Sequence, residues 1–370
     1  DYFQMDILGF KVNMMDTQKS IYTSTFGNIN TYTIYVAALL AISMILFTQE
    51  KNQKRMFWYY GNMILTSFAL IMGSSDNAYL SLAAIFGLAP LWLFQTKTGL
   101  RRYVISLATF FTVILCINGI NKAYASSVLG IDSAFKLIAG TKFLPVLVVL
   151  LWVIAVVLIF MNRKPQALMN RTTDDSMNKI AVYIWIGVIA VVCLAVLFVL
   201  YDANLGGHAD KYGALSSYVV FNDEWGTQRG YVWKRAMEIY TKKLNLLQKI
   251  FGYGPDTFAL IMQYYYPGEM QNGRMVIFDS AHNEYLHYLV TTGFVGMASY
   301  LVFMVSSIVA MAKKIKEQPI VVAVMMAVLA YAIQAVVNIN LPIAMPIILQ
   351  LLAMGVGRKK TADKAKEKAE

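Results

Sequence analysis

A series of apolar segments, each close to twenty residues long, is the feature that most constrains the fold of this chain. A helix of about twenty residues crosses the roughly 30 Å hydrocarbon core of a bilayer. The segments therefore predict about nine transmembrane helices, at approximately 31–47, 56–72, 78–94, 103–118, 144–161, 180–201, 284–311, 319–337 and 341–356. Strands of a membrane β-barrel would instead alternate apolar and polar residues over about ten positions. We expect an all-α fold, a polytopic transmembrane helical bundle.

The charged residues are few and unevenly placed. Hydrophobic residues make up 58% of the chain and charged residues 14%, whereas a soluble domain carries about a quarter charged residues. Basic clusters follow every second apolar segment, at Lys51–Arg55, Lys97–Arg102, Arg163–Arg171, Lys313–Lys316 and 358–370. Loops rich in lysine and arginine face the cytoplasm. The net charge of +11 thus predicts membrane topology and does not indicate a nucleic-acid partner.

The longest connection separates the sixth and seventh predicted helices. It holds roughly eighty residues, whereas median loops hold about 4–6, and it lies on the side opposite the basic loops. We therefore expect six spans within 1–201, an extracytoplasmic loop at 202–283, three spans within 284–357 and a basic cytoplasmic tail at 358–370. This arrangement predicts a multi-pass protein of the cytoplasmic membrane. An extracytoplasmic start and an odd number of spans also predict further helices before Asp1.

The long connection carries its own helical pattern. From Arg229 to Ile250 an apolar stripe at helical spacing predicts an amphipathic helix, and its members are Trp233, Ala236, Met237, Tyr240, Leu244 and Leu247. Such a helix would lie on the membrane surface or against the transmembrane bundle. Gly252 is expected to end it, and Pro255 to begin a second helix.

The stretch "AHNEYLHYLVTTGFVG", residues 281–296, places a histidine where this loop enters the seventh predicted helix. We expect Asp279 or Ser280 to cap that helix, since their side-chain oxygens accept from free N–H groups of the first turn. His287 falls on a different helical face from His282. The face of His282 also carries small residues, which let a neighbouring helix approach closely; its members are His282, Leu286, Leu289, Gly293 and Gly296. That face is expected to point into the bundle.

His282 has two interpretations. The positive end of a helix dipole disfavours a protonated imidazole, and a neutral histidine accepts a proton as a general base does. The alternative is a histidine that only packs at the membrane interface.

Arg229 lies one helical turn before Trp233 and so extends the apolar stripe. An arginine on the buried side near a membrane needs an anionic partner, and the guanidinium fork suits phosphate oxygens. The alternatives are an ion pair with Asp223 or Glu224, or contact with a lipid head group. Four further cations lie in the same loop: Lys211, Lys234, Arg235 and Arg274. Together they would form an electropositive mouth for a pyrophosphate, whereas singly each is an ordinary surface charge.

The sequence gives no metal-binding pattern. The paired carboxylates Asp223-Glu224 and Asp174-Asp175 have no further ligand at a suitable spacing, and phosphate-binding glycine loops and Gly-x-Ser-x-Gly motifs are missing from the chain. We expect no metal and no other cofactor.

With these residues in view, the chain resembles the O-antigen ligase and polymerase family of bacterial membrane proteins. His282-Asn283 is followed by nine residues and then by Gly293-x-x-Gly296, which is similar to the ligase motif of that family. Arg229, Trp233, Gly252-x-Gly254 and Phe258 are similar to its upstream run. "TFGNIN" at 25–30 resembles the segment that opens a span in the middle of the family's chains.

The resemblance implies a transferase whose donor is a glycan on polyprenyl pyrophosphate and whose acceptor is a hydroxyl of a glycan, a lipid core or a protein. It implies His282 as the base, and it leads us to expect a substrate site of Arg229, Arg235, Arg274, Trp233 and Asn283. Gly252, Gly254, Gly293 and Gly296 would be structural. Many members carry Ser-Arg where this chain has "GSSDNAYL", with Asp76 in place of the arginine. That difference favours a polymerase slightly over a ligase.

Two other classes of function are considered. A flippase or other transporter of lipid-linked oligosaccharides needs polar groups at mid-membrane and often has repeated halves; these spans carry almost no charges, and no repeat is visible. A non-catalytic membrane protein of envelope assembly would not depend on His282.

Overall fold

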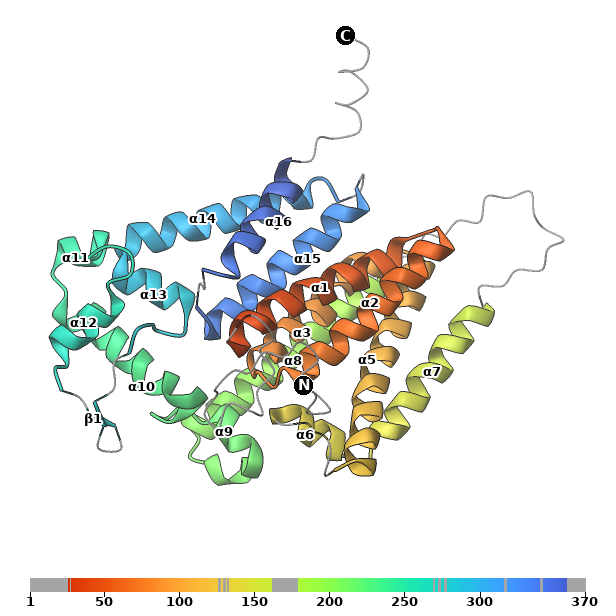
Figure 1. Ribbon diagram of the computed structural model, residues 1–370, viewed down its shortest axis with the longest axis horizontal. Coiled ribbons are helices and arrows are strands. Elements are labelled where there is room, and N and C mark those ends of the chain that lie inside the picture. The colour runs from red at the N-terminus through yellow and green to blue at the C-terminus, as the bar shows by residue number, and fades with distance from the viewer. Residues whose placement is uncertain are drawn as a thin grey trace, which may run out of the picture. The chain divides into compact units, whose positions relative to one another are not determined.

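The protein is a helical membrane protein. The computed structural model describes residues 26, 28–125, 128, 131, 133–161, 179–268, 270–271, 274–275, 278–315, 318–339 and 342–357. Within these ranges the only strands are the antiparallel pair β1 (Met270–Gln271) and β2 (Arg274–Met275), and helices make up most of the rest (Figure 1). The predicted all-α fold class is confirmed.

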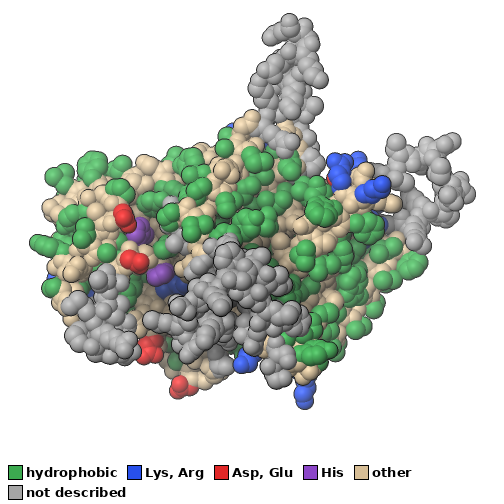
Figure 2. All heavy atoms as spheres, viewed as in Figure 1, with side chains coloured by type: hydrophobic (Ala, Val, Ile, Leu, Met, Phe, Trp, Pro, Cys, Tyr) green, Lys and Arg blue, Asp and Glu red, His purple; other side chains and the backbone are tan. Residues whose placement is uncertain are grey.

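Six helices of the described part are long and apolar enough to cross a membrane. They are α1 (Ile29–Gln49), α5 (Lys97–Ala123), α7 (Leu144–Met161), α8 (Ile180–Asn204), α14 (Gly293–Ala312), and α15 (Pro319–Gln334) with its continuation η6 (Ala335–Val337). The other predicted spans are also helical: α2 (Gln53–Met72), α3 (Asn77–Leu88) with α4 (Pro90–Leu93), and α16 (Met345–Gly357). Hydrophobic side chains accordingly cover much of the visible surface (Figure 2).

The chain divides into two compact units. The first holds residues 1–185, 308–334 and 341–370, and the second holds residues 186–307 and 335–340. In the first unit α1 packs against α2, α3 and α15, and α5 packs against α7 (Figure 1). Helix α6 (Ser133–Gly140) packs against both α5 and α7.

Helix α1 forms the centre of the first unit, since most of its side chains are buried against neighbouring helices. Leu40, Ala41, Met44 and Ile45 are fully buried, and alanines let neighbouring helices approach closely in a membrane. The Asn28 side chain caps the first turn by accepting from the N–H groups of Asn30 and Thr31. The "TFGNIN" segment therefore marks a helix start, as predicted.

The far end of α1 is capped from another helix. Arg102 of α5 donates to the carbonyl oxygens of Phe47, at 3.0 Å, and Glu50, at 2.6 Å. A cation at a helix C-terminus satisfies free carbonyls and the negative end of the dipole. One member of the predicted basic clusters is therefore used to join α1 to α5.

The second unit contains the long connection, whose described residues are largely helical. Its helices before the histidine segment are η4 (Ala209–Leu215), α9 (Ser216–Val219), α10 (Trp225–Glu238), the π-turn η5 (Ile239–Lys243), α11 (Leu246–Phe251) and α12 (Phe258–Tyr265). Helix α13 (Glu284–Thr291) follows the histidine. A shared apolar core holds α10, η5, α12 and α13 together and comprises Val232, Ala236, Ile239, Leu244, Phe258, Ile261, Met262, Ala281, Leu286 and Val290.

The predicted single amphipathic helix from Arg229 to Ile250 is wrong in two respects. The helix stops after η5, and a capping box between Asn245 and Gln248 begins α11 as a separate element. The buried stripe is Val232, Ala236 and Ile239, whereas Met237 and Leu247 of the predicted stripe are exposed. Ala236 and Leu244 of the predicted stripe are buried as expected, so the prediction fails only in part.

One buried hydrogen bond joins α3 to α15, and it gives a test of the first unit. The Ser81 hydroxyl donates to the Gln334 side-chain oxygen at 2.7 Å, and both side chains are buried. We expect Ser81→Ala to lower the free energy of unfolding in detergent by about 1 kcal/mol, because the amide oxygen is left unsatisfied. Ser106→Ala is the control, since its hydroxyl donates only within α5, to the Arg102 carbonyl. Equal stability losses in both variants would contradict this assignment.

Candidate functional site

His282 lies just before α13 and not inside it. Its backbone is left-handed, with φ of 46°, and the helix begins after Asn283, whose side chain accepts from the Leu286 N–H at 3.0 Å. The expectation that Asp279 or Ser280 caps this helix is therefore wrong. The prediction that His282 shares one helical face with Gly293 and Gly296 is wrong for the same reason. Asn283 serves as the cap.

The two glycines of the motif mark a break rather than a helical face. Helix α13 ends at Thr291, Gly293 has φ of 70°, and α14 starts there. A Cβ on Gly293 would collide with the Ile250 carbonyl group, and a Cβ on Gly252 would collide with the Thr291 carbonyl oxygen. Gly252 is also left-handed, with φ of 70°. Glycine is therefore required at both positions, by conformation and by space.

Hydrogen bonds fix this contact between the two glycine motifs. The Thr291 carbonyl oxygen accepts from the N–H groups of Tyr253 and Gly254, each at 2.8 Å. Thus the end of α13, the start of α14 and the Gly252-x-Gly254 turn form one packed junction. Gly296 lies one turn later, where a Cβ would collide with the Thr292 side chain.

Trp233 fixes the other side of the histidine segment. Its indole Nε1–H donates to the Ala281 carbonyl oxygen at 2.8 Å, and Ala281 is fully buried. Helix α10 therefore holds the residue that precedes His282. Asn283 caps α13 on the other side, so the imidazole is positioned from both neighbours.

Arg229 emerges from a strained turn at the start of α10. Gly226, Thr227 and Gln228 all have left-handed backbone, with φ of 60°, 58° and 74°, and this conformation is unfavourable for a β-branched threonine. The Arg229 guanidinium donates to the Gly226 carbonyl oxygen at 3.1 Å. Backbone strain of this kind is concentrated at functional sites.

The distribution of strained residues supports this location. Five non-glycine residues of the described part have positive φ, and four of them are Thr227, Gln228, Asp256 and His282. Ser74 is the fifth, and it lies in the first unit just before the exposed Asp76. Strain therefore gathers around the arginine and histidine segments of the second unit.

Burial and the Arg229 charge both lower the pKa of His282, while Asp279 opposes them by raising it. Loss of water around the ring disfavours the charged imidazolium, and a nearby guanidinium repels it. His282 is consequently neutral at physiological pH, which is the state a general base needs. Its Nδ1 is buried and has no hydrogen-bond partner among the described residues.

Two further residues near the histidine had no role in the sequence prediction. His287 stacks on Phe258, with ring centroids 5.3 Å apart, so the phenylalanine of the upstream run packs directly on α13. Glu284 is buried although it is a carboxylate. It occupies the first helical residue of α13, where a negative charge complements the helix dipole. The sequence signal that could have identified Glu284 is an acidic residue directly before an apolar helical run.

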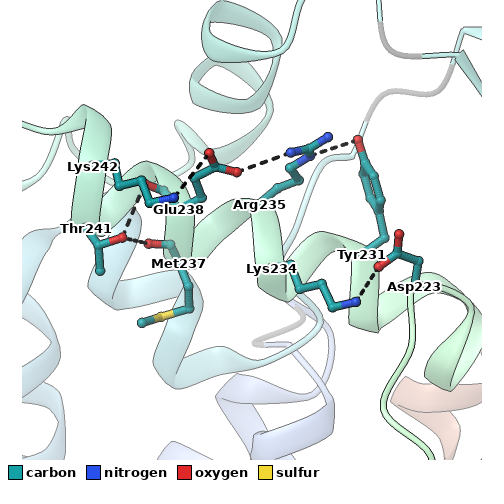
Figure 3. Close-up of polar contacts among 8 residues, drawn as sticks. All are labelled: Asp223, Tyr231, Lys234, Arg235, Met237, Glu238, Thr241 and Lys242. Carbon is teal, nitrogen blue, oxygen red and sulfur yellow. Dashed lines mark hydrogen bonds and ion pairs between the residues drawn. The ribbon is translucent and has the colours of Figure 1, made fainter.

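Three of the other predicted cations are held by neighbours, and Figure 3 shows two of them, Lys234 and Arg235. Arg235 forms an ion pair with Glu238 at 3.2 Å and lies 4.5 Å from the centre of the Tyr266 ring. Lys234 pairs with Asp223 at 2.6 Å. Lys211 pairs likewise with Asp202, at 3.2 Å. Phosphate binding by Arg235 stays a prediction, and the side chain of Arg274 lies outside the described residues.

A mostly apolar hollow of about 480 Å³ opens beside the histidine segment. Its lining residues come from α10, from the segment before it, and from α13 and α14: Phe221, Trp233, Lys234, Met237, Asn283, Tyr285, Leu286, Leu289 and Met297. One lysine and one asparagine are its main polar groups. The hollow therefore suits a hydrocarbon chain that carries a polar end group.

The carboxylates and histidines of the site do not form a metal centre in the part of the chain that the structure describes. No group of three or more His, Cys, Asp or Glu side chains is close enough to hold an ion there. Asp223 is engaged by Lys234, and Asp174-Asp175 lies outside the described residues.

Comparison with known proteins agrees with this geometry. Residues 126–301 match the family model described as O-antigen ligase, and that range includes Arg229, Trp233, Gly252, His282 and Gly296. This match to slightly less than half of the chain supports the resemblance found from the motifs. No curated protein matches the chain.

The glycine junction yields a prediction on stability. Gly293→Ala should lower the free energy of unfolding by at least about 1–2 kcal/mol, because alanine disfavours left-handed backbone, and its methyl group would also collide with the Ile250 carbonyl. Gly187→Ala in α8 is the control, since nothing lies within 4 Å of the added Cβ. Thermal unfolding in detergent measures both. An unfolding temperature unchanged by Gly293→Ala would show that the junction has room for a side chain and does not require glycine.

The charges around His282 yield a prediction on its titration. Diethyl pyrocarbonate modifies an imidazole only in its neutral form, so mass spectrometry of the His282 peptide across pH reports its pKa. We expect a midpoint below about 6.5, the ordinary value for histidine. Arg229→Gln should raise the midpoint, because a repelling charge is removed, and Asp279→Asn should lower it. Shifts in the opposite directions would exclude the proposed electrostatic environment.

Proposed function

From the match of residues 126–301 to the O-antigen ligase family model, we propose that the protein is a membrane glycosyltransferase. It transfers or polymerises a glycan carried on polyprenyl pyrophosphate, onto an acceptor hydroxyl at the outer face of the cytoplasmic membrane. The observation that carries this proposal is the half-buried His282, held between Ala281 and Asn283, with the Arg229 charge near enough to lower its pKa. A proton acceptor and a phosphate-binding cation are the two groups that such a transfer requires.

The reaction divides between these two residues. The His282 imidazole accepts the proton of the acceptor hydroxyl, and the oxygen attacks the anomeric carbon of the donor sugar. A new carbon–oxygen bond forms as the bond from that carbon to the pyrophosphate oxygen breaks, with inversion at the carbon. Arg229 stabilises the charge that develops on the departing pyrophosphate. Because pyrophosphate is a good leaving group and has an arginine partner, the scheme needs no metal.

The apolar hollow accommodates the lipid end of the donor in this scheme. Leu286, Leu289 and Met297 supply an apolar wall, which suits polyprenyl carbons. Asn283 and Lys234 are the polar groups of the same hollow, and they would face the polar end of the donor. Trp233 lines the hollow and also holds the Ala281 carbonyl, so donor binding and base position depend on one side chain.

The acceptor distinguishes two forms of this proposal. A polymerase extends a growing glycan, whereas a ligase transfers the glycan to a lipid core or a protein. Asp76, which stands where many relatives carry arginine, is exposed at the start of α3 and supplies no cation. This favours the polymerase form, which in vitro reaction with lipid-linked repeat units alone would test.

The two central residues give the direct test. We expect His282→Ala to lower glycan transfer by about 10²–10⁴-fold, as for loss of a positioned base, and Arg229→Ala by about 10²–10³-fold, as for loss of a group that stabilises developing charge. Transfer is measured with purified protein and a lipid-linked glycan, and folding is checked by thermal unfolding. His208→Ala is the matched control, because that histidine is exposed and pairs with Asp202 at 2.7 Å. Full activity of a folded His282→Ala protein would refute the base assignment and favour a non-catalytic protein.

A further inference from the structure

Helix α11 presents an apolar face that no other described element covers. Leu246, Leu247 and Phe251 are 71%, 69% and 62% exposed. Their spacing places them within one side of the six-residue helix, since each residue advances by about 100°. Large apolar side chains grouped on a surface in this way mark a site of interaction with a lipid or a protein. We call these three side chains the α11 face.

The position of α11 in its unit shows what lies next to this face. The residues that end it, Ile250 and Gly252, contact Gly293, where the membrane-crossing helix α14 begins. The first side chains of α14, Phe294 and Val295, are exposed and apolar as well. The α11 face therefore adjoins the N-terminal end of a helix that is long and apolar enough to cross a membrane.

Charge and rigidity agree with a lipid surface. Lys242 and Lys243 precede α11 and are exposed, and lysines next to an apolar face suit anionic head groups. Gln248 of α11 donates to the Tyr253 hydroxyl at 2.8 Å, and that hydroxyl lies 2.9 Å from the Tyr265 hydroxyl of α12. The face is thus held in place before it meets any partner.

We propose that the α11 face inserts into the membrane surface from which α14 starts. The side chains of Leu246, Leu247 and Phe251 enter the boundary between head groups and acyl chains, and Lys242 and Lys243 contact anionic head groups. Because the Gly252–Gly293 contact joins α11 to the end of α13, this insertion fixes the height of the His282 segment above the lipid. The proposal does not depend on the transferase reaction.

A fluorescent label at Leu247 tests the insertion. The free cysteines Cys116 and Cys193 are replaced by alanine, Leu247→Cys is labelled with an environment-sensitive dye, and the protein is reconstituted in vesicles of phosphatidylethanolamine and phosphatidylglycerol. We expect nitroxide-bearing lipids to quench this label about threefold more than a label at Glu224→Cys, an exposed control position. Aqueous iodide should quench the two labels in the opposite order.

Two outcomes would overturn the proposal. Strong iodide quenching at position 247 without lipid quenching would place the α11 face in water. Protection from both quenchers would show that a protein, such as a second copy of this chain, covers it. A label at Phe251→Cys supplies a second reading from the same face if the Leu247 variant does not fold.

Discussion

The Thr291 carbonyl oxygen is the point on which the functional unit depends. It accepts two backbone N–H groups from the Gly252-x-Gly254 turn, and Gly252 packs against Gly293 without room for a side chain. Two motifs some forty residues apart thus meet through backbone atoms alone. A backbone contact of this kind is more rigid than one between side chains, because it leaves no rotamers to rearrange. The unit therefore presents the end of α13 and the end of α11 as one body.

This junction explains why His282 can lie outside regular structure and still be positioned. Its neighbours are each fixed, Ala281 by the Trp233 indole and Asn283 by its capping bond to Leu286. The left-handed backbone at His282 costs free energy, and the buried core around Phe258, Leu286 and Val290 offsets that cost. Inside a helix, the imidazole would point outward from the helix face on which residue 282 falls. The loop position brings it within electrostatic range of Arg229 instead.

The sequence predicts the helices well because each apolar run has to satisfy its own backbone hydrogen bonds in lipid. It also identifies the histidine and glycine motifs, because these motifs are defined by the spacing of residues along the chain. It fails at the helix boundaries inside 281–296, because periodicity alone does not show that Thr291, Thr292 and Gly293 end one helix and begin another. The engagement of Arg235 by Glu238 and Tyr266 also escapes prediction, because its aromatic partner comes from a distant part of the loop. Left-handed residues such as Thr227 leave no trace in periodicity at all.

In the proposed reaction, the Arg229 charge beside His282 couples donor binding to proton transfer. In the free protein Arg229 lowers the pKa of His282, which keeps the imidazole neutral but makes it a weaker base. A pyrophosphate bound to Arg229 would bring negative charge to the same place and raise that pKa, since an anion favours the imidazolium. His282 would then be the stronger base only when the donor is bound. That is the stage at which the acceptor hydroxyl has to be deprotonated. Donor binding would in this way prepare the proton acceptor without any movement of the backbone, which the glycine junction already holds.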